Sequence, residues 1–291
     1  MPDLKKLVAE ELGEPVDPRV ADLARAIADR HGRAARVVLF YGSCLRQRQL
    51  DGLMLDFYLI VSDYRAAYAK RWLALANRLV PPNVFYIERD GLAAKYAVLS
   101  EADFARECGP EARSTSVVAR FAQPARLVWS AGKAAAAKAI DSVSRCAPTL
   151  LGWTVPMLPK GTPVLDLWKH AFRLTFAAEL RAERSDRSAA IVEADEKRYQ
   201  AFGEAALAGL AIGNRRKRAR WWKRMRGKGK LLSVLRLAKA SATFAGGADY
   251  IAWKINRHAG TKIALKPWQR RWPLLAGLTL LPRLLKSGAV R

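Results

Sequence analysis

The first 130 residues alternate between amphipathic segments and short, continuous apolar runs. Apolar residues at helical spacing predict helix over residues 4–32, interrupted at Pro15 and Pro18, and again over 64–79. The apolar runs predict strands over 37–41, 53–61, 83–89, 92–100 and 122–130. Because Asp90 and Gly91 separate the third run from the fourth, we expect these two strands to form a hairpin. Ser100, with an acid three residues later, predicts the start of a helix.

After residue 130 the pattern becomes helical. Helices are predicted over 134–146, 164–182, 193–211, 231–245 and 249–258, and the segment 148–163, rich in Pro and Gly, predicts a connection. We therefore expect an α/β domain with a mixed sheet over 1–130, a mainly helical domain over 131–214, and a basic, Trp-rich helical region over 215–291.

The charge distribution separates these parts further. The sequence has 51 Lys and Arg against 26 Asp and Glu, a formal net charge of +25. Residues 1–130 contribute +3 of this charge and residues 131–291 contribute +22, with ten basic residues between 215 and 230. Such an excess indicates contact with a polyanion, either nucleic acid or an anionic lipid surface.

The cysteines and histidines exclude other classes of protein. Three cysteines without a CxxC pair argue against a disulfide scaffold or a structural zinc site, and three distant histidines argue against His-based metal chemistry. The charged N-terminal segment does not resemble a secretory signal, and no run approaches the ~20 apolar residues that span a bilayer. We therefore expect a cytoplasmic protein.

Two features of neighbouring predicted strands indicate phosphate and metal chemistry. Gly42 and Ser43 end the first strand, where a Gly turn places backbone N–H groups and a hydroxyl in position to hold phosphate oxygens. Asp56 is the one acid within the apolar run 53–61, and a buried carboxylate requires a metal ion or a basic partner. Together they suit Mg²⁺-dependent nucleotidyl transfer. The alternative is an ordinary turn beside a structural acid, since Tyr58 replaces the second acid typical of these enzymes.

A resemblance to a known family strengthens this interpretation. Tyr41-Gly42-Ser43 followed by residues 54–63 (MLDFYLIVSD) resembles the signature of the mitochondrial translocator assembly and maintenance protein family. Similar segments follow in the same order, so that the resemblance covers about residues 36–205. It implies a nucleotidyltransferase fold and a phosphatidate cytidylyltransferase, which makes CDP-diacylglycerol from CTP and phosphatidate in phospholipid biosynthesis. No obligate protein partner is implied.

The chemistry and the resemblance together assign roles to individual residues. Asp56 is expected to be the principal Mg²⁺ ligand, and Glu179, at the position of a family Asp, the second acidic ligand. Gly42 and Ser43 are expected to bind the triphosphate. Three basic residues are expected to contact phosphate: Lys95, Arg120 and Arg181.

Several of these assignments have a structural alternative. Lys95, a lone charge in an apolar strand, is also what an edge strand carries, and Arg120 and Arg181 are also consistent with solvated helix charges. Asp63 joins the catalytic candidates because the family keeps an acid there. It lies seven residues after Asp56, however, where we expect it at the strand end, orienting a base or a helix.

The C-terminal region interleaves tryptophan with basic residues. Trp221 and Trp222 lie within the charge run, and Trp253, Trp268 and Trp272 follow it. This composition suits single-stranded nucleic acid, an anionic membrane surface or a merely solvated face, and the apolar stretches after residue 230 favour the membrane. We expect a peripheral enzyme on the inner face of the cell membrane. Two other functions stay open: nucleotidyl transfer to RNA or another small acceptor, and a catalytically inactive scaffold with the same fold.

Overall fold

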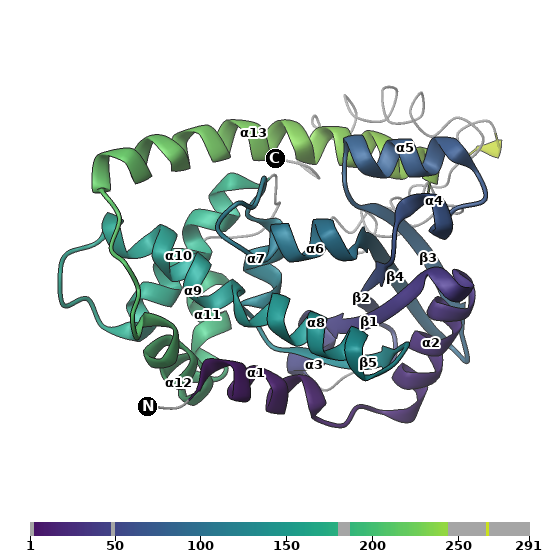
Figure 1. Ribbon diagram of the computed structural model, residues 1–291, viewed down its shortest axis with the longest axis horizontal. Helices are drawn as coiled ribbons and strands as arrows, with labels where there is room; N and C mark the ends of the chain where they lie inside the picture. The colour runs from purple at the N-terminus through teal and green to yellow at the C-terminus, as the bar shows by residue number, and fades with distance from the viewer. Residues whose placement is uncertain (1–2, 48–49, 180–186, 244–265, 268–291) are drawn as a thin grey trace.

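The computed structural model describes residues 3–47, 50–179, 187–243 and 266–267 (Figure 1). Its strands are β1 (Ala35–Tyr41), β2 (Met54–Val61), β3 (Asn83–Arg89), β4 (Leu92–Ser100) and β5 (Ala125–Ser130). Its helices are α1 (Leu4–Gly13), α2 (Pro18–Asp29), α3 (Ser43–Gln47), α4 (Tyr64–Ala67), α5 (Arg71–Leu79), α6 (Glu101–Glu107), α7 (Ser116–Phe121), α8 (Lys133–Ser144), α9 (Cys146–Thr154), α10 (Val164–Ala178), α11 (Arg187–Glu193), α12 (Glu196–Leu207) and α13 (Arg215–Thr243), with 3-10 turns η1 (Gly32–Ala34) and η2 (Val155–Met157). The predicted helix over 249–258 and Trp253, Trp268 and Trp272 lie outside the described residues.

The five strands form one mixed sheet in the order β3-β4-β2-β1-β5. β2 pairs parallel with β4 and antiparallel with β1, while β3 and β5 are the antiparallel edge strands. The predicted hairpin is confirmed, because β3 and β4 pair directly across Asp90 and Gly91. The expectation of a mixed α/β sheet is therefore met. Since β4 is an interior strand, the alternative that Lys95 marks an edge strand is wrong.

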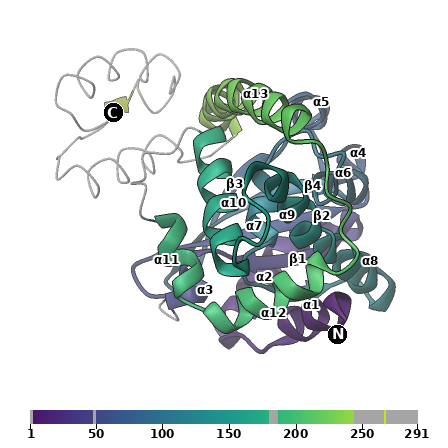
Figure 2. The same ribbon diagram turned by 90° about the vertical axis from the view of Figure 1, so that its left-hand side faces the viewer.

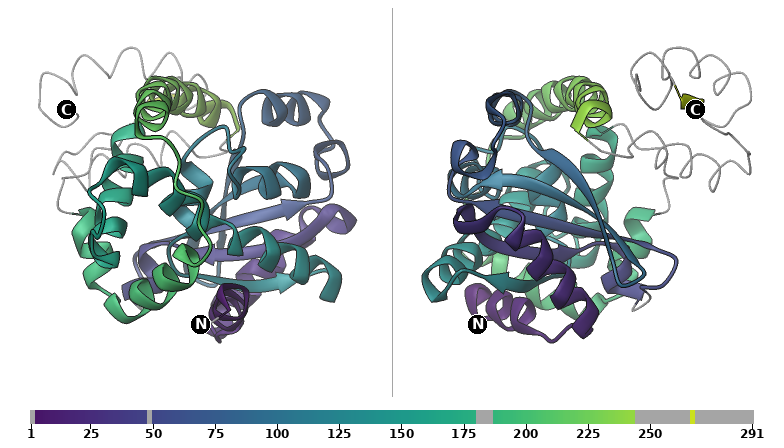
Figure 3. Two further views of the ribbon diagram at one scale, coloured as in Figure 1. Left: turned by 60° about the vertical axis from the view of Figure 1, so that its left-hand side comes forward. Right: turned by 90° about the vertical axis from the view of Figure 1, so that its right-hand side faces the viewer.

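Helices cover both faces of the sheet (Figures 2 and 3). Side chains alternate along each strand, so that Val38 and Phe40 pack on one face and Val37 and Leu39 on the other. The core on the first face includes residues of α2, α4 and α5, and the core on the second includes residues of α1 and of α6 to α13. The second face, with its thicker helical layer, carries the polar cluster described below.

The hydrophobic core on the second face continues across residue 130. It joins Leu39 and Tyr58 of the sheet to Trp153, Trp168 and Trp222 of the following helices. The predicted boundary between an α/β domain and a helical domain therefore does not separate two hydrophobic cores among the described residues.

The charged segment after residue 214 is part of a long helix. Residues Arg215–Thr243 form α13, whereas the sequence pattern predicted a helix only from residue 231 (Figure 1). Trp222 is 1% exposed and donates its Nε1–H to the carbonyl of Trp153 at 2.9 Å, while the ring of Trp221 lies 4.6 Å from that of Trp153. The expectation that this Trp pair forms a surface contact is wrong for Trp222, since hydrophobic burial holds it in the core.

The backbone of α13 closely approaches the end of α10. A Cβ atom added at Gly229 would overlap the carbonyl oxygen of Ala178, whereas a Cβ added at Gly227 meets nothing within 4 Å. Gly229 therefore permits the close packing that brings α13 beside Glu179, the residue that follows α10.

Other differences from the sequence pattern are local. The predicted connection over 148–163 contains the helix α9, because Pro148 falls in the first turn, where its missing N–H has no helical partner, and because Leu150 and Leu151 are buried. The predicted helix over 64–79 divides into α4 and α5. The predicted helix start at Ser100 is confirmed, since its Oγ accepts the N–H of Asp103 at 3.2 Å. Within the described residues, no helix has both the length and the apolarity needed to cross a membrane.

Candidate active site

The site residues predicted on the strands meet at one end of the sheet. Asp56 pairs in register with Tyr41 on β1 and with Lys95 on β4. Alternation along β2 and β4 directs Asp56 and Lys95 toward the thicker helical layer, on the face that carries Tyr58 and Ala97. Lys95 Nζ lies 3.1 Å from Asp56 Oδ1, and their side chains are 31% and 20% exposed. The ion pair is therefore accessible from solvent.

The turn after β1 packs directly against this carboxylate. Gly42 has a φ of 100°, and a Cβ atom there would lie 3.1 Å from Asp56 Oδ2. A larger residue would both strain the backbone and crowd the carboxylate. Ser43 begins the short helix α3. The structure thus places four of the candidate site residues, Gly42, Ser43, Asp56 and Lys95, at one end of the sheet.

A second polar group lies on the helical side. Arg120, from α7, has its Nη1 3.6 Å from Glu179 Oε1 and donates to the carbonyl of Ser116 at 2.8 Å. The hydroxyl of Ser116 donates to the same Glu179 oxygen. Glu179 is 11% exposed and follows the last residue of α10, which ends at Ala178 instead of continuing to residue 182 as predicted.

Electrostatics connect the two groups. Burial alone would lower the pKa of Arg120, but the nearby groups Tyr58, Glu179, Tyr41 and Asp56 outweigh it, and the pKa rises. Burial raises the pKa of the Tyr41 phenol, and the charge of Asp56 raises it further. The charge of Arg120 therefore interacts with the carboxylates of both Asp56 and Glu179. The phenols of Tyr41 and Tyr58 are uncharged at neutral pH.

Arg236 is a member of this cluster that the sequence analysis missed. It projects from α13, and its Nη1 donates to Ser116 Oγ at 3.1 Å while its Nε donates to the carbonyl of Pro81 at 2.7 Å. Burial lowers its pKa. Lys95 is a candidate because it is a charged residue within an apolar run. Arg236 has the same pattern, since it lies between Leu235 and Leu237.

Two predicted residues are not brought into the cluster. Asp63 lies beyond the opposite end of β2 and caps α4, its Oδ1 accepting the N–H groups of Arg65 at 2.7 Å and Ala66 at 3.1 Å. The expectation that it orients a helix is met, and the structure gives it no catalytic position. Arg181 lies outside the described residues.

The acidic residues suit a metal ion that also binds substrate. Among the described residues there is no group of three or more His, Cys, Asp or Glu able to hold a metal. Mg²⁺, however, is commonly held by one or two carboxylates together with substrate phosphates. Asp56, which is partly exposed beside Lys95, fits that use. Glu179 is less readily available as a metal ligand, because its carboxylate already contacts Arg120 and Ser116.

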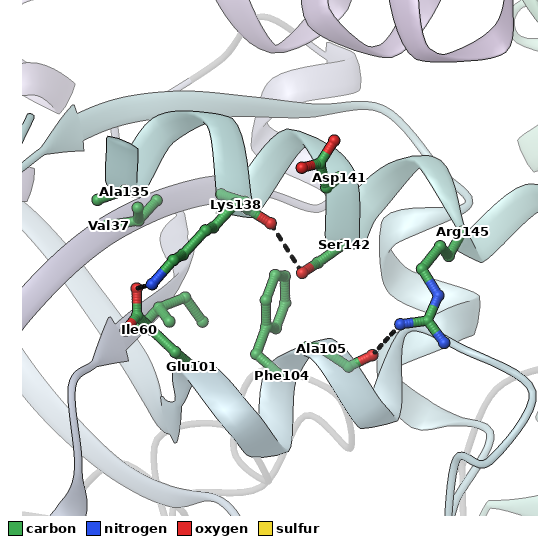
Figure 4. Close-up of a pocket in the computed structure, with 11 residues that line it drawn as sticks. Val37, Ile60, Glu101, Phe104, Ala105, Ala135, Lys138, Asp141, Ser142 and Arg145 are labelled. Atoms are coloured by element: carbon green, nitrogen blue, oxygen red, sulfur yellow. Dashed lines mark hydrogen bonds and ion pairs between the residues drawn. The ribbon is translucent and has the colours of Figure 1, made fainter. Parts of the chain in front are cut away.

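A separate cavity of about 250 Å³ lies between α6 and α8 (Figure 4). It is lined by Val37, Ile60 and Phe104, and Lys138 Nζ lies 3.8 Å from Glu101 Oε1 across it. Val37 and Ile60 pair at the opposite ends of β1 and β2 from Tyr41 and Asp56. This cavity therefore does not belong to the polar cluster.

Comparison with known proteins adds no family assignment. No protein-family model matches the sequence, and neither does any of the curated proteins.

Proposed function

We propose that this protein is a nucleotidyltransferase of the phosphatidate cytidylyltransferase type, which makes CDP-diacylglycerol and pyrophosphate from CTP and phosphatidate. The observation that carries the proposal is the position of Asp56. Its carboxylate lies against the Gly42 turn and beside Lys95, and the charge of Arg120 interacts with it. A carboxylate, a Gly-Ser turn and convergent basic groups are what a triphosphate with its metal requires. The family resemblance of residues 36–205 supplies the preference for CTP and phosphatidate.

The residues of the cluster then have defined tasks. Gly42 and Ser43 hold the triphosphate through backbone N–H groups and the hydroxyl, and Lys95 turns from Asp56 to a phosphate oxygen. Bound Mg²⁺, held by Asp56 with Glu179 as the second acid, would neutralise charge on the transferring phosphoryl group. A phosphate oxygen of phosphatidate forms a bond to the α-phosphorus of CTP, and the bond from that phosphorus to the β-phosphate oxygen breaks. The protein contributes positioning and charge stabilisation.

The exposed side of α13 supports a peripheral location at an anionic membrane. Nine of the ten basic residues between 215 and 230 are exposed. Further along the same helix, among the side chains that the structure describes, the exposed residues are apolar: Leu231, Val234 and Leu235. Each basic residue near an anionic surface contributes about 1 kcal/mol of attraction. A lipid membrane meets both features, whereas a nucleic acid meets only the charge.

The proposal is tested by pyrophosphate release from each of the four nucleoside triphosphates with Mg²⁺. Vesicles that contain phosphatidate are compared with control vesicles of equal surface charge. The anionic lipid of the control vesicles is phosphatidylglycerol, which has no phosphomonoester group. We expect release only from CTP with phosphatidate. Release from another nucleotide, or without phosphatidate, would contradict the proposed acceptor or base and return attention to RNA or a small acceptor.

A second candidate function is a catalytically inactive scaffold with the nucleotidyltransferase fold. The ion pairs of Asp56 with Lys95 and of Glu179 with Arg120 favour it, because both carboxylates already have basic partners. Calorimetric titration with CTP separates the candidates. A scaffold would bind no CTP in a Mg²⁺-dependent manner, whereas the enzyme would.

A further inference from the structure

Arg236, like Lys239, differs from the exposed basic residues of α13 because its side chain points into the protein. Its Nη1 reaches Ser116 Oγ at 3.1 Å, and Ser116 in turn contacts Glu179 and, through its carbonyl, Arg120. Ser116 is therefore shared by two guanidinium groups and one carboxylate. It links α13 to α7 and to the end of α10.

Among the described side chains that contact Ser116, positive charge exceeds negative charge. Arg120 and Arg236 carry two positive charges, and Glu179 supplies one negative charge. Burial lowers the pKa of Arg236 and the charge of Arg120 lowers it further, and these two causes outweigh the opposing effect of Tyr58, Glu179 and Glu107. Two arginines held together in a largely buried position favour an anionic ligand between them, and a phosphomonoester carries about −1.5 to −2 charges at neutral pH. Guanidinium groups also match phosphate oxygens in bidentate geometry.

The helix that carries Arg236 and its neighbour α5 both expose apolar side chains. The helix α13 contacts the segment that follows α5, since Arg236 donates to the carbonyl of Pro81 at 2.7 Å and Lys239 to that of Pro82 at 2.8 Å. Figure 1 shows α5 beside the C-terminal half of α13. The two helices together expose six large apolar side chains: Trp72, Leu75, Leu79, Leu231, Val234 and Leu235. A ligand with a phosphate and acyl chains would use both the arginine pair and this surface.

We propose that Arg236 and Arg120 form the subsite for the phosphate group of a lipid phosphomonoester, whose acyl chains extend over the apolar surface of α5 and α13. This inference rests on the proposed function, because it identifies where the lipid acceptor binds. It also gives the membrane-facing helix a direct connection to the site, since α13 exposes apolar residues on one side and presents Arg236 on the other.

The test measures binding of dihexanoyl phosphatidate, a water-soluble short-chain lipid, by isothermal titration calorimetry without nucleotide. Arg236→Gln is compared with the wild type and with Arg25→Gln, which removes the same charge from an exposed position on α2. Loss of a charge-assisted contact predicts affinity about tenfold to a hundredfold weaker for Arg236→Gln. We expect Arg25→Gln to bind as the wild type does. Equal affinity in all three proteins would overturn the subsite.

Two further titrations test whether binding is specific for the lipid and for the guanidinium group. Inorganic phosphate is titrated in the same way, and binding as tight as that of the lipid would overturn the assignment to a lipid ligand. Arg236→Lys keeps the charge but not the bidentate geometry, so we expect affinity between those of the wild type and Arg236→Gln. If Arg236→Gln does not fold, unchanged affinity in Arg236→Lys overturns the proposal, and weakened affinity supports it.

The experiments distinguish failure of the subsite from failure of the proposed reaction. If the wild type releases pyrophosphate from CTP while Arg236→Gln binds phosphatidate normally, the subsite is wrong and the reaction stands. If phosphatidate binding depends on Arg236 but no nucleotide is turned over, the subsite stands and the reaction is wrong.

Discussion

The contact between α13 and α10 gives a prediction that depends only on packing. Gly229 and Gly227 lie two residues apart in the same helix, but their surroundings differ. A Cβ at Gly229 would overlap the carbonyl oxygen of Ala178, whereas the space around Gly227 is open to 4 Å. Gly229→Ala therefore forces α13 away from α10, and Gly227→Ala is its matched control.

The magnitude follows from two opposing contributions. Replacing Gly by Ala within a helix stabilises it by about 0.5–1 kcal/mol, and this gain is common to both variants. Overpacking costs about 1–3 kcal/mol and applies only at Gly229. The free energy of unfolding of Gly229→Ala should thus be about 1–3 kcal/mol below that of Gly227→Ala, and Gly227→Ala should be at least as stable as the wild type.

The assay is urea unfolding followed by circular dichroism, with the three proteins compared at one pH and salt concentration. Because α13 carries Arg236, Gly229→Ala should also weaken binding of dihexanoyl phosphatidate, and Gly227→Ala should not. Equal unfolding midpoints for the two variants would refute the close packing of α13 on α10.

Three other substitutions, one of them with a matched control, test separate parts of the account. Asp56→Asn should abolish pyrophosphate release without lowering the thermal unfolding midpoint, and retained turnover would refute the role of Asp56. Trp222→Ala should destabilise the protein by about 3–5 kcal/mol in urea, whereas the exposed Trp72→Ala should stay within about 0.5 kcal/mol, so similar costs would contradict the burial of Trp222. Burial and the neighbouring Arg236 lower the pKa of Lys239 from 10.5 to about 7, so the folded protein binds fewer protons than the unfolded chain between these pH values. Stability should therefore gain a contribution as pH rises from 7 toward 10.5, and a Lys239→Met variant with the same pH dependence as the wild type would contradict this.

Much of the sheet and part of the site follow from the sequence because they depend on local pattern. Continuous runs of large apolar residues mark β1 and β2, and a lone acid in such a run identifies Asp56. The hairpin of β3 and β4 follows from its turn residues. These features need no knowledge of which segments meet in space.

What the sequence does not predict depends on contacts between distant segments. Arg236 meets Ser116 across 120 residues, and no local pattern reports that contact. The burial of Trp222 depends on Trp153 in the same way, so a basic and aromatic run suggested a surface contact where one side chain is in the core. The Pro and Gly content of 148–163 predicts a connection, although Pro148, in the first turn of α9, breaks no hydrogen bond.

The most direct test of the central claim is detection of the lipid product. The full chain is incubated with CTP, Mg²⁺ and phosphatidate vesicles, and the extracted lipids are analysed by mass spectrometry, with Asp56→Asn as the control. The account predicts CDP-diacylglycerol in the wild-type sample and none in the control. Absence of this product from the wild-type sample, under conditions in which the protein is folded and bound to the vesicles, would contradict the proposed function.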